Sequence, residues 1–238
     1  MPGQCRLCEA TLRGFGWAPV CDSCLASARP SRAANFCERC GLPFETNAPL
    51  HGGLTCALCR AESPAFDVAR SGGIFDGDYR RLIHLLKYDG MRPLAGPLAA
   101  WTVEALPELG GVDVLLPVPL HWTRRVKRGF NQAELLANEL SRVSGIPVDT
   151  RALRRTRSTP SQAGLSRRQR RENLRGVFTV KNAARVRGLS VTVIDDVMTT
   201  GTTVAACAQV LKKAGASRVT AITAARVMRR VLEWNDSH

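Results

Sequence analysis

The sequence predicts an α/β fold, a parallel sheet with helices on both faces, preceded by a small cysteine-rich segment that binds metal. Residues 1–63 contain four C-x-x-C pairs, whereas residues 64–238 alternate buried strands with amphipathic helices. A chain of 238 residues suits one domain of ordinary size with a small addition. We place the boundary between the two parts at Glu62-Ser63-Pro64, where the hydrophobic pattern changes.

The cysteine-rich segment predicts two structural zinc sites. Two residues between cysteines let one tight turn direct both thiolates at the same tetrahedral ion, so four pairs supply two sites of four thiolates each. The predicted ligands are Cys5, Cys8, Cys21, Cys24, Cys37, Cys40, Cys56 and Cys59. Placing the first four on one ion and the last four on the other needs the shortest loops, but the spacing alone leaves an interleaved arrangement open. Because the apolar content of the segment is low, bound metal would supply most of its folding free energy.

From residue 64 onward, hydrophobic periodicity predicts an alternating series of elements. Strands are expected over residues 68–75, 112–118, 191–195 and 218–225, and helices over residues 79–86, 94–106, 130–144 and 202–214. Such an alternation is typical of a parallel sheet whose ligands bind at the carboxyl ends of the strands.

The strand at residues 191–195 leads into the most informative stretch of the chain. It ends at two adjacent acids, Asp195 and Asp196, which would be costly to bury without a partner. A loop of small residues then opens the next helix: Thr199, Thr200, Gly201, Thr202 and Thr203. Backbone amides, hydroxyl groups and the positive end of the helix dipole suit a phosphate, and the carboxylates suit ribose hydroxyls. The loop has neither the lysine of a Walker P-loop nor the glycines of a dinucleotide fingerprint.

This stretch, VTVIDDVMTTGTT, resembles the 5-phosphoribosyl-1-pyrophosphate (PRPP) motif of type I phosphoribosyltransferases. The resemblance implies that the loop after the strand at 112–118 holds the pyrophosphate of PRPP together with Mg²⁺. Basic residues follow that strand closely, and Asn131 and Gln132 are expected at the start of the next helix, facing ligand. The candidates of this loop are Pro117, Val118, Pro119, Arg124, Arg125, Arg128, Asn131 and Gln132. With Asp195 and Asp196, Arg124 and Arg125 are the candidate catalytic residues.

A second basic segment, residues 154–172, is too polar and rich in turn formers around residues 158–164 to pack, so it predicts a mobile loop that closes over the site. Its arginines are candidates for nucleic-acid binding: Arg154, Arg155, Arg167, Arg168, Arg170 and Arg171. A solvated helix face or contact with pyrophosphate would explain the same residues. The formal net charge of +14 favours polyanionic partners in general.

The sequence also predicts a cytoplasmic protein that does not insert into membranes. It has no apolar run approaching 18 residues, and cysteines occupy the N-terminal region where a signal peptide would carry its apolar stretch. Clustered C-x-x-C pairs favour metal binding over disulfides.

Three features together resemble the ComF family of competence and DNA-uptake proteins, including its GntX-like branch. They are the four cysteine pairs, the string RGFNQ at residues 128–132, and Gln162, Arg171 and Asn173-Leu174 before Phe178. The resemblance covers nearly the whole chain. It implies a double zinc ribbon in residues 1–63 and a type I phosphoribosyltransferase domain in residues 64–238. It also implies single-stranded DNA, and other uptake proteins such as a helicase, as partners.

We therefore expect a PRPP-binding, phosphoribosyltransferase-like protein acting in single-stranded DNA uptake or utilisation. Two alternatives stay open: an active phosphoribosyltransferase of nucleotide metabolism, and a non-catalytic PRPP-sensing regulator. Purine-salvage members of the fold usually place an aspartate where this chain has Thr199, so a purine acceptor would lack its general acid or base. The acceptor is not identified by the sequence.

Overall fold

The computed structural model describes residues 3–12, 19–44, 54–104, 111–159 and 166–228. At its centre lies a four-stranded parallel sheet in the order β1-β6-β5-β2. The strands are β1 (Val68–Ile74), β2 (Val114–Pro117), β5 (Ser190–Met198) and β6 (Arg218–Arg226). The predicted strands and their parallel arrangement are confirmed, and β5 continues through both acids to Met198.

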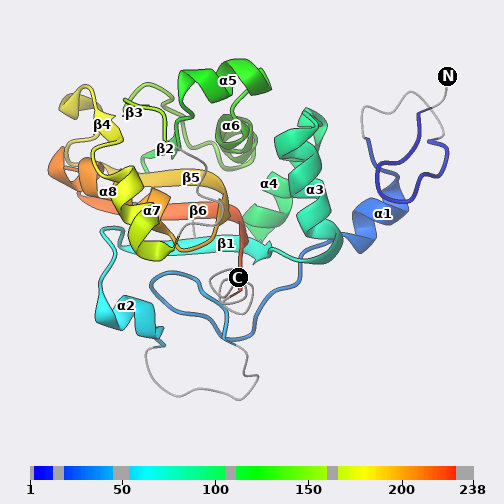
Figure 1. The fold of residues 1–238 in the computed structure, drawn as a ribbon, viewed down its shortest axis with the longest axis horizontal. Helices are drawn as coiled ribbons and strands as arrows, with labels where there is room; N and C mark the ends of the chain where they lie inside the picture. The colour runs from blue at the N-terminus through cyan, green and yellow to red at the C-terminus, as the bar shows by residue number, and fades with distance from the viewer. Residues whose placement is uncertain (1–2, 13–18, 45–53, 105–110, 160–165, 229–238) are drawn as a thin grey trace.

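Helices cover both faces of this sheet (Figure 1). One face carries α3 (Gly77–Tyr88), α4 (Ala95–Glu104) and α6 (Gln132–Ser144), and the other carries α8 (Thr202–Lys213). A 3₁₀ turn, η1 (Arg92–Leu94), precedes α4, and a second one, η2 (Ala183–Arg185), precedes β5. The predicted helices are therefore present, and the α/β fold class is confirmed.

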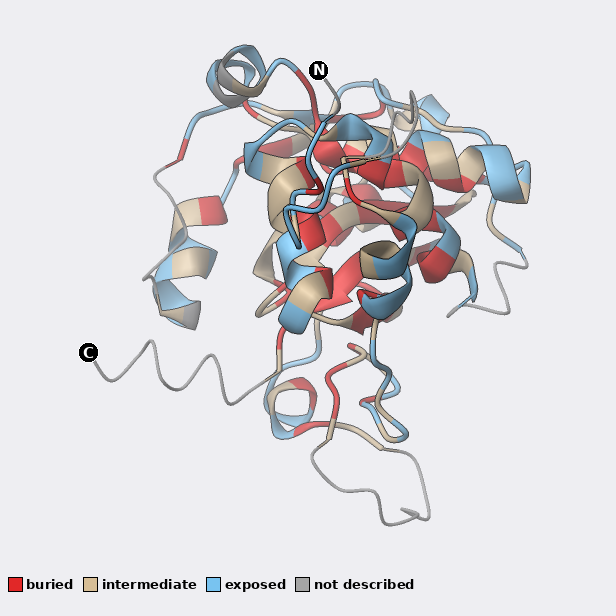
Figure 2. Cartoon of the chain, turned by 90° about the vertical axis from the view of Figure 1, so that its right-hand side faces the viewer, coloured by how far each residue is buried: buried red, intermediate tan, exposed pale blue. Residues whose placement is uncertain are grey.

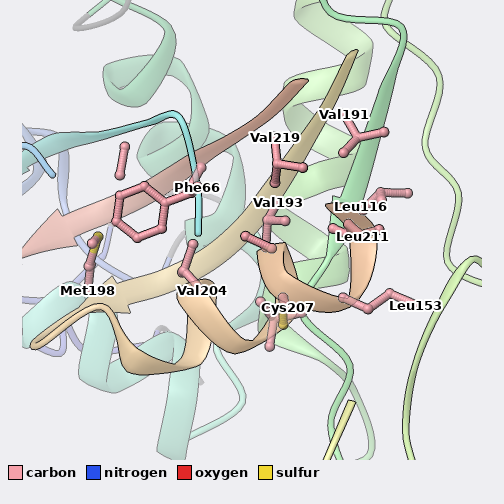
Figure 3. Packing of buried hydrophobic residues seen from close by; sticks show 14 of the residues in the cluster. Phe66, Leu116, Leu153, Val191, Val193, Met198, Val204, Cys207, Leu211 and Val219 are labelled. Carbon is pink, nitrogen blue, oxygen red and sulfur yellow. The ribbon is translucent and has the colours of Figure 1, made fainter. Parts of the chain in front are cut away.

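The strand β5 is buried between two hydrophobic cores. Val191 and Val193 pack with Val204, Cys207 and Leu211 of α8 (Figure 3), whereas the neighbouring Ile194 belongs to the core under α3, α4 and α6. In Figure 2 the buried residues accordingly concentrate in the sheet and on the helix faces turned toward it. This packing on both faces explains the nearly continuous apolar run before Asp195.

The cysteine-rich segment forms two similar units, each ending in a short helix, α1 (Asp22–Ser27) and α2 (Ala57–Ala61). The unit that contains α1 lies beside α3, and the unit that contains α2 lies below β1 in Figure 1. The cysteines of this second unit belong to the same hydrophobic core as α8. Both units contribute buried residues to the cores of the sheet. The division at residue 63 thus stays a prediction from composition, because each core contains residues from both sides of it.

The edge strand β1 is covered by this segment. The amide of Ala69 donates to the carbonyl of Arg39 (2.7 Å), and the amide of Ile74 donates to Ser31 (3.0 Å). A Cβ at Gly73 would lie 2.1 Å from Cβ of Pro30, so glycine is needed where the segment containing Pro30 passes over β1. Backbone amides at this edge of the sheet thereby find hydrogen-bond acceptors within the same chain.

Between β2 and β5 the structure contains elements that the sequence patterns did not predict. Residues 122–128 form α5 (Trp122–Arg128), and β3 (Leu153–Arg155) pairs antiparallel with β4 (Phe178–Val180). Residues 167–174 form α7 (Arg167–Leu174), which starts at a capping box between Ser166 and Gln169. The expected mobile loop at 154–172 thus has regular structure at both ends, and residues 160–165 lie outside the described part.

Within the described residues, no helix is both long enough and apolar enough to cross a membrane.

Candidate functional site

The loop predicted to bind phosphate, residues 199–203 and called the phosphate loop below, lies at the carboxyl end of β5, and α8 begins within it at Thr202. Gly201 has a φ of 77°, and a Cβ there would lie 2.6 Å from Cε of Met198. The hydroxyl groups of Thr200 and Thr202 are 3.0 Å apart. The positive φ favours glycine, so the loop keeps a tight turn that leads directly into the positive end of the helix dipole.

The two acids differ in their surroundings although they are adjacent. Asp196 is 3% exposed, and its carboxylate forms an ion pair with Nζ of Lys87 (2.8 Å). Burial would raise the pKa of Asp196, but the Lys87 ammonium outweighs it, so that pKa lies below its ordinary value. Asp195 is partly exposed, and burial together with the Asp196 carboxylate raises the pKa of Asp195 to about 8. One acid is thus held ionised while its neighbour takes up a proton easily.

Lys87 is a residue that the sequence reasoning missed. It lies in the last turn of α3, next to Leu86 of the buried stripe, and its side chain is 22% exposed. A lysine at a helix C-terminus is common because it offsets the helix dipole, so its position gave no reason to single it out. Its partner is far away in the sequence, and only the packing of α3 against the sheet brings the two together.

The predicted pyrophosphate loop adjoins the acids directly. The amide of Val118 donates to the carbonyl of Ile194 (2.8 Å), which places the loop after β2 beside the residue before Asp195. Asn131 is 2% exposed; its Nδ2 donates to the carbonyl of Val118 (3.0 Å), and its Oδ1 accepts from the amide of Ala133 (3.1 Å). Both ends of the Asn131 amide are therefore used within the protein, where they cap α6 and hold the loop.

The basic residues of this region belong to α5 rather than to an extended loop. Arg125 pairs with Glu134 (3.0 Å), and Nη1 of Arg128 donates to Oε1 of the buried Gln132 (3.2 Å). The guanidinium of Arg128 also lies 5.4 Å from the ring of Tyr88. The side chains of Arg124 and Lys127 lie outside what the structure describes. The remaining loop candidates, Pro117 and Pro119, flank Val118 at the end of β2.

The arginines of α7 have three different environments. Nη1 of Arg170 donates to the hydroxyl of Thr199 in the phosphate loop (3.2 Å), and Arg171 pairs with Glu62 of the cysteine-rich segment. Arg168 is exposed and pairs with Glu172 within the helix (3.1 Å). The helix thus connects the phosphate loop to the cysteine-rich segment. Nothing is described of the side chain of Arg167, while Arg154 and Arg155 lie in β3 on the other side of the undescribed residues 160–165.

The eight paired cysteines form two groups in the order of the sequence, which resolves the arrangement left open by their spacing. Within each group all four Sγ atoms lie within 4.8 Å of one another: Cys5, Cys8, Cys21 and Cys24 in the first, and Cys37, Cys40, Cys56 and Cys59 in the second.

In both cysteine groups the first cysteine accepts similar hydrogen bonds. Sγ of Cys5 accepts from the amides of Leu7 (3.4 Å) and Cys21 (3.3 Å), and Sγ of Cys37 accepts from those of Cys40 (3.5 Å) and Cys56 (3.3 Å). Backbone donors aimed at sulfur stabilise thiolates, so both groups have the donor set and the environment for a zinc ion.

Arg226 is a second residue that the sequence reasoning missed. It is the last residue of β6 and is 3% exposed, and its Nη1 donates to the carbonyls of Met198 (2.9 Å) and Thr199. These two hydrogen bonds therefore hold the backbone at the start of the phosphate loop. An arginine directly after the small apolar residues Ala224 and Ala225 is the pattern that could have indicated it.

Comparison with known proteins agrees with this geometry. A family model described as the phosphoribosyl transferase domain matches residues 126–237. DNA utilization protein YhgH of Escherichia coli O157:H7 is 35% identical over 225 residues, which cover 92% of this chain and 95% of the relative. Competence protein F of Haemophilus influenzae is 30% identical over 209 residues, which cover 84% of this chain and 87% of the relative.

Competence protein ComFC of Bacillus subtilis is 36% identical over 114 residues, which cover 48% of this chain and 44% of the relative. These relatives confirm the resemblance drawn from the cysteine pairs and the string RGFNQ. The chain belongs to the ComF family, which includes YhgH and competence protein F, and it combines a type I phosphoribosyltransferase domain with two four-cysteine groups.

Proposed function

We propose that this protein binds PRPP with Mg²⁺ at the carboxyl end of β5 and acts there in the use of single-stranded DNA in the cytoplasm. The observation that carries the proposal is the buried, ion-paired Asp196 directly before a phosphate loop that a glycine and two arginines hold in place. The carboxylates would orient the ribose hydroxyls, and the loop would bind the 5-phosphate. The names of the relatives, DNA utilization protein and competence protein, support the DNA part of the proposal.

In this proposal Mg²⁺ neutralises the pyrophosphate of PRPP, and the loop at Pro117–Pro119 lies where that group would extend from the ribose. The arginines of α5 would add positive charge, as expected for Arg124, Arg125 and Arg128. The experiment is calorimetry of PRPP binding, followed by measurement of pyrophosphate release with and without single-stranded DNA. Absence of PRPP binding would overturn the proposal. Release only with DNA would identify DNA as acceptor or activator, and binding without release would favour a PRPP sensor.

The two cysteine groups are proposed to hold structural zinc, which suits four thiolates in tetrahedral arrangement. Metal analysis of the purified protein is expected to give two zinc ions per chain. A content near zero, with cysteines freely reactive toward a thiol reagent, would contradict this.

The acid pair predicts that PRPP affinity depends on pH. The pKa of Asp195 is raised to about 8, and its ordinary value is 3.8, so the folded protein binds this proton more tightly than the unfolded chain does. The contribution of Asp195 to stability therefore decreases as pH rises from about 4 to about 8. Because the ribose hydroxyls need the ionised form, affinity is expected to increase by up to about tenfold per pH unit below 8 and then to level off. Calorimetry over this range tests it. In the control variant Asp195→Asn this increase of PRPP affinity with pH should be absent. If the wild type and the control show the same dependence of affinity on pH, the role of Asp195 is contradicted.

Two exposed aromatic rings near the site suit stacking of single-stranded bases. Trp122 at the start of α5 is 68% exposed and Tyr88 at the end of α3 is 64% exposed, and Arg128 lies over the Tyr88 ring. Phe130, in contrast, is buried, with Arg92 over its ring (5.1 Å). The exposed pair and the surrounding arginines form the stacking and charge combination that single-stranded nucleic acids bind.

We expect Trp122→Ala and Tyr88→Ala each to weaken single-stranded DNA binding by about 1–3 kcal/mol, the usual effect of losing one stacked base. Fluorescence anisotropy with a labelled oligonucleotide, at several salt concentrations, measures this. Phe36→Ala is the matched control, because Phe36 is an exposed aromatic residue on the cysteine-rich segment under Arg70. Equal losses in all three variants, or an affinity independent of salt, would contradict this surface.

A further inference from the structure

The phosphate loop and the second cysteine group, Cys37, Cys40, Cys56 and Cys59, meet around the side chain of Arg226. Arg226 donates to the carbonyls of Met198 and Thr199. It also lines a cavity of about 490 Å³ together with Cys40 and Cys59 of the cysteine group and with Thr200–Thr202 of the loop. Arg226 thus links the predicted metal site to the PRPP site.

The charge of Arg226 needs a partner, because the residue is 3% exposed and its Nε has no hydrogen-bond partner among the described residues. In the described part of the chain no carboxylate forms an ion pair with it. Four thiolates around Zn²⁺ would carry a charge of about −2 and balance the guanidinium, whereas four protonated thiols would not.

The first cysteine group offers an internal comparison. It lies beside α3 on the other core, where Cys8 is exposed, and Nη2 of Arg81 donates to the carbonyl of Leu7 (3.0 Å). Arg81 is exposed and already pairs with Asp78 (2.9 Å), so it does not depend on thiolates for its counter-charge. The two groups share their ligand geometry but differ in their connection to the site.

We propose that Arg226 is a positioning residue that couples the second four-cysteine site to PRPP: zinc there holds the guanidinium, and the guanidinium fixes the start of the phosphate loop. The inference rests on the proposed binding of PRPP. Coupling between two sites is reciprocal, so whatever factor zinc adds to PRPP affinity, PRPP must add to zinc affinity at the second site.

The experiment follows zinc transfer from the full chain to a colorimetric chelator, with and without PRPP. PRPP is expected to slow release from the second site by about fivefold or more and to leave release from the first site within about twofold. A Cys8→Ser variant lacks a ligand of the first site, so the kinetic phase of zinc release that remains in it belongs to the second site. In Arg226→Met the protection by PRPP should disappear and PRPP affinity should fall by about tenfold or more, while zinc release without PRPP still shows two sites.

Arg81→Met is the matched control and should behave like the wild type, since it removes an arginine that contacts the other cysteine group. If Arg226→Met does not fold, Arg226→Lys keeps the charge but not the planar fork, and should retain zinc with reduced protection. Equal protection of both sites, no protection, or protection of undiminished size in the folded Arg226 variant would overturn the coupling alone. Failure of the wild type to bind PRPP in calorimetry would instead overturn the proposed function.

Discussion

Replacing Asp196 by alanine is expected to abolish measurable PRPP binding. Asp196 is 3% exposed, and its ion pair with Lys87 keeps its carboxylate ionised. It is therefore a fixed negative charge at the point where ribose hydroxyls would bind. Removing one partner of a buried charged hydrogen bond typically costs about 2–5 kcal/mol in binding. Calorimetry with PRPP and Mg²⁺ measures the loss.

The same substitution leaves Lys87 without its carboxylate partner, so lower stability could itself weaken binding. The double variant Lys87→Met/Asp196→Ala separates the two effects, because replacing both members of a buried pair by apolar groups is far less destabilising than removing one. It is expected to recover much of the lost stability in thermal unfolding and none of the affinity for PRPP. Unchanged affinity in Asp196→Ala, or recovered affinity in the double variant, would show that the ribose binds elsewhere.

The sheet could be predicted from the sequence because its strands carry their own evidence. Val191, Val193 and Ile194 are apolar and β-branched on both faces of the strand, as expected for a strand buried on both sides, and helices such as α3 show a clear apolar stripe. Short elements such as α5 and β3 have no such pattern. Their segments are dominated by arginines, which predict exposure but not the conformation of the backbone.

The site could be predicted where its residues are adjacent in the sequence, and not where the fold assembles them. Asp195, Asp196 and the threonine loop form one continuous motif, whereas Lys87 and Arg226 lie more than 25 residues from their partners and act through the packing of α3 and β6. Asn131 shows a related limit. Its place at a helix start was predicted, but only the structure shows that its amide is used to hold Val118.

The two cysteine groups are expected to differ strongly in their importance for stability. All four cysteines of the second group are buried and belong to the core that contains Val193 and Val204, whereas in the first group only Cys5 is buried. Cys59→Ser should therefore lower the free energy of unfolding by about 3 kcal/mol or more, since it weakens the metal site and leaves a polar group in a core. Cys8→Ser, at an exposed position, should cost much less.

Chemical denaturation of both variants, with zinc content measured in parallel, tests this difference. The second group also supports the edge strand β1, because the carbonyl of Arg39, between Cys37 and Cys40, accepts a hydrogen bond from the amide of Ala69. The two segments are closely packed there, since a Cβ at Gly41 would lie 2.9 Å from the carbonyl oxygen of Ala69. Loss of metal there should thus expose β1, and amide exchange of Ala69 should accelerate in Cys59→Ser but not in Cys8→Ser. Similar losses of stability in both variants would mean that the two groups are equivalent ribbons. A loss confined to Cys59→Ser would instead make the second group a structural part of the sheet that carries the proposed PRPP site.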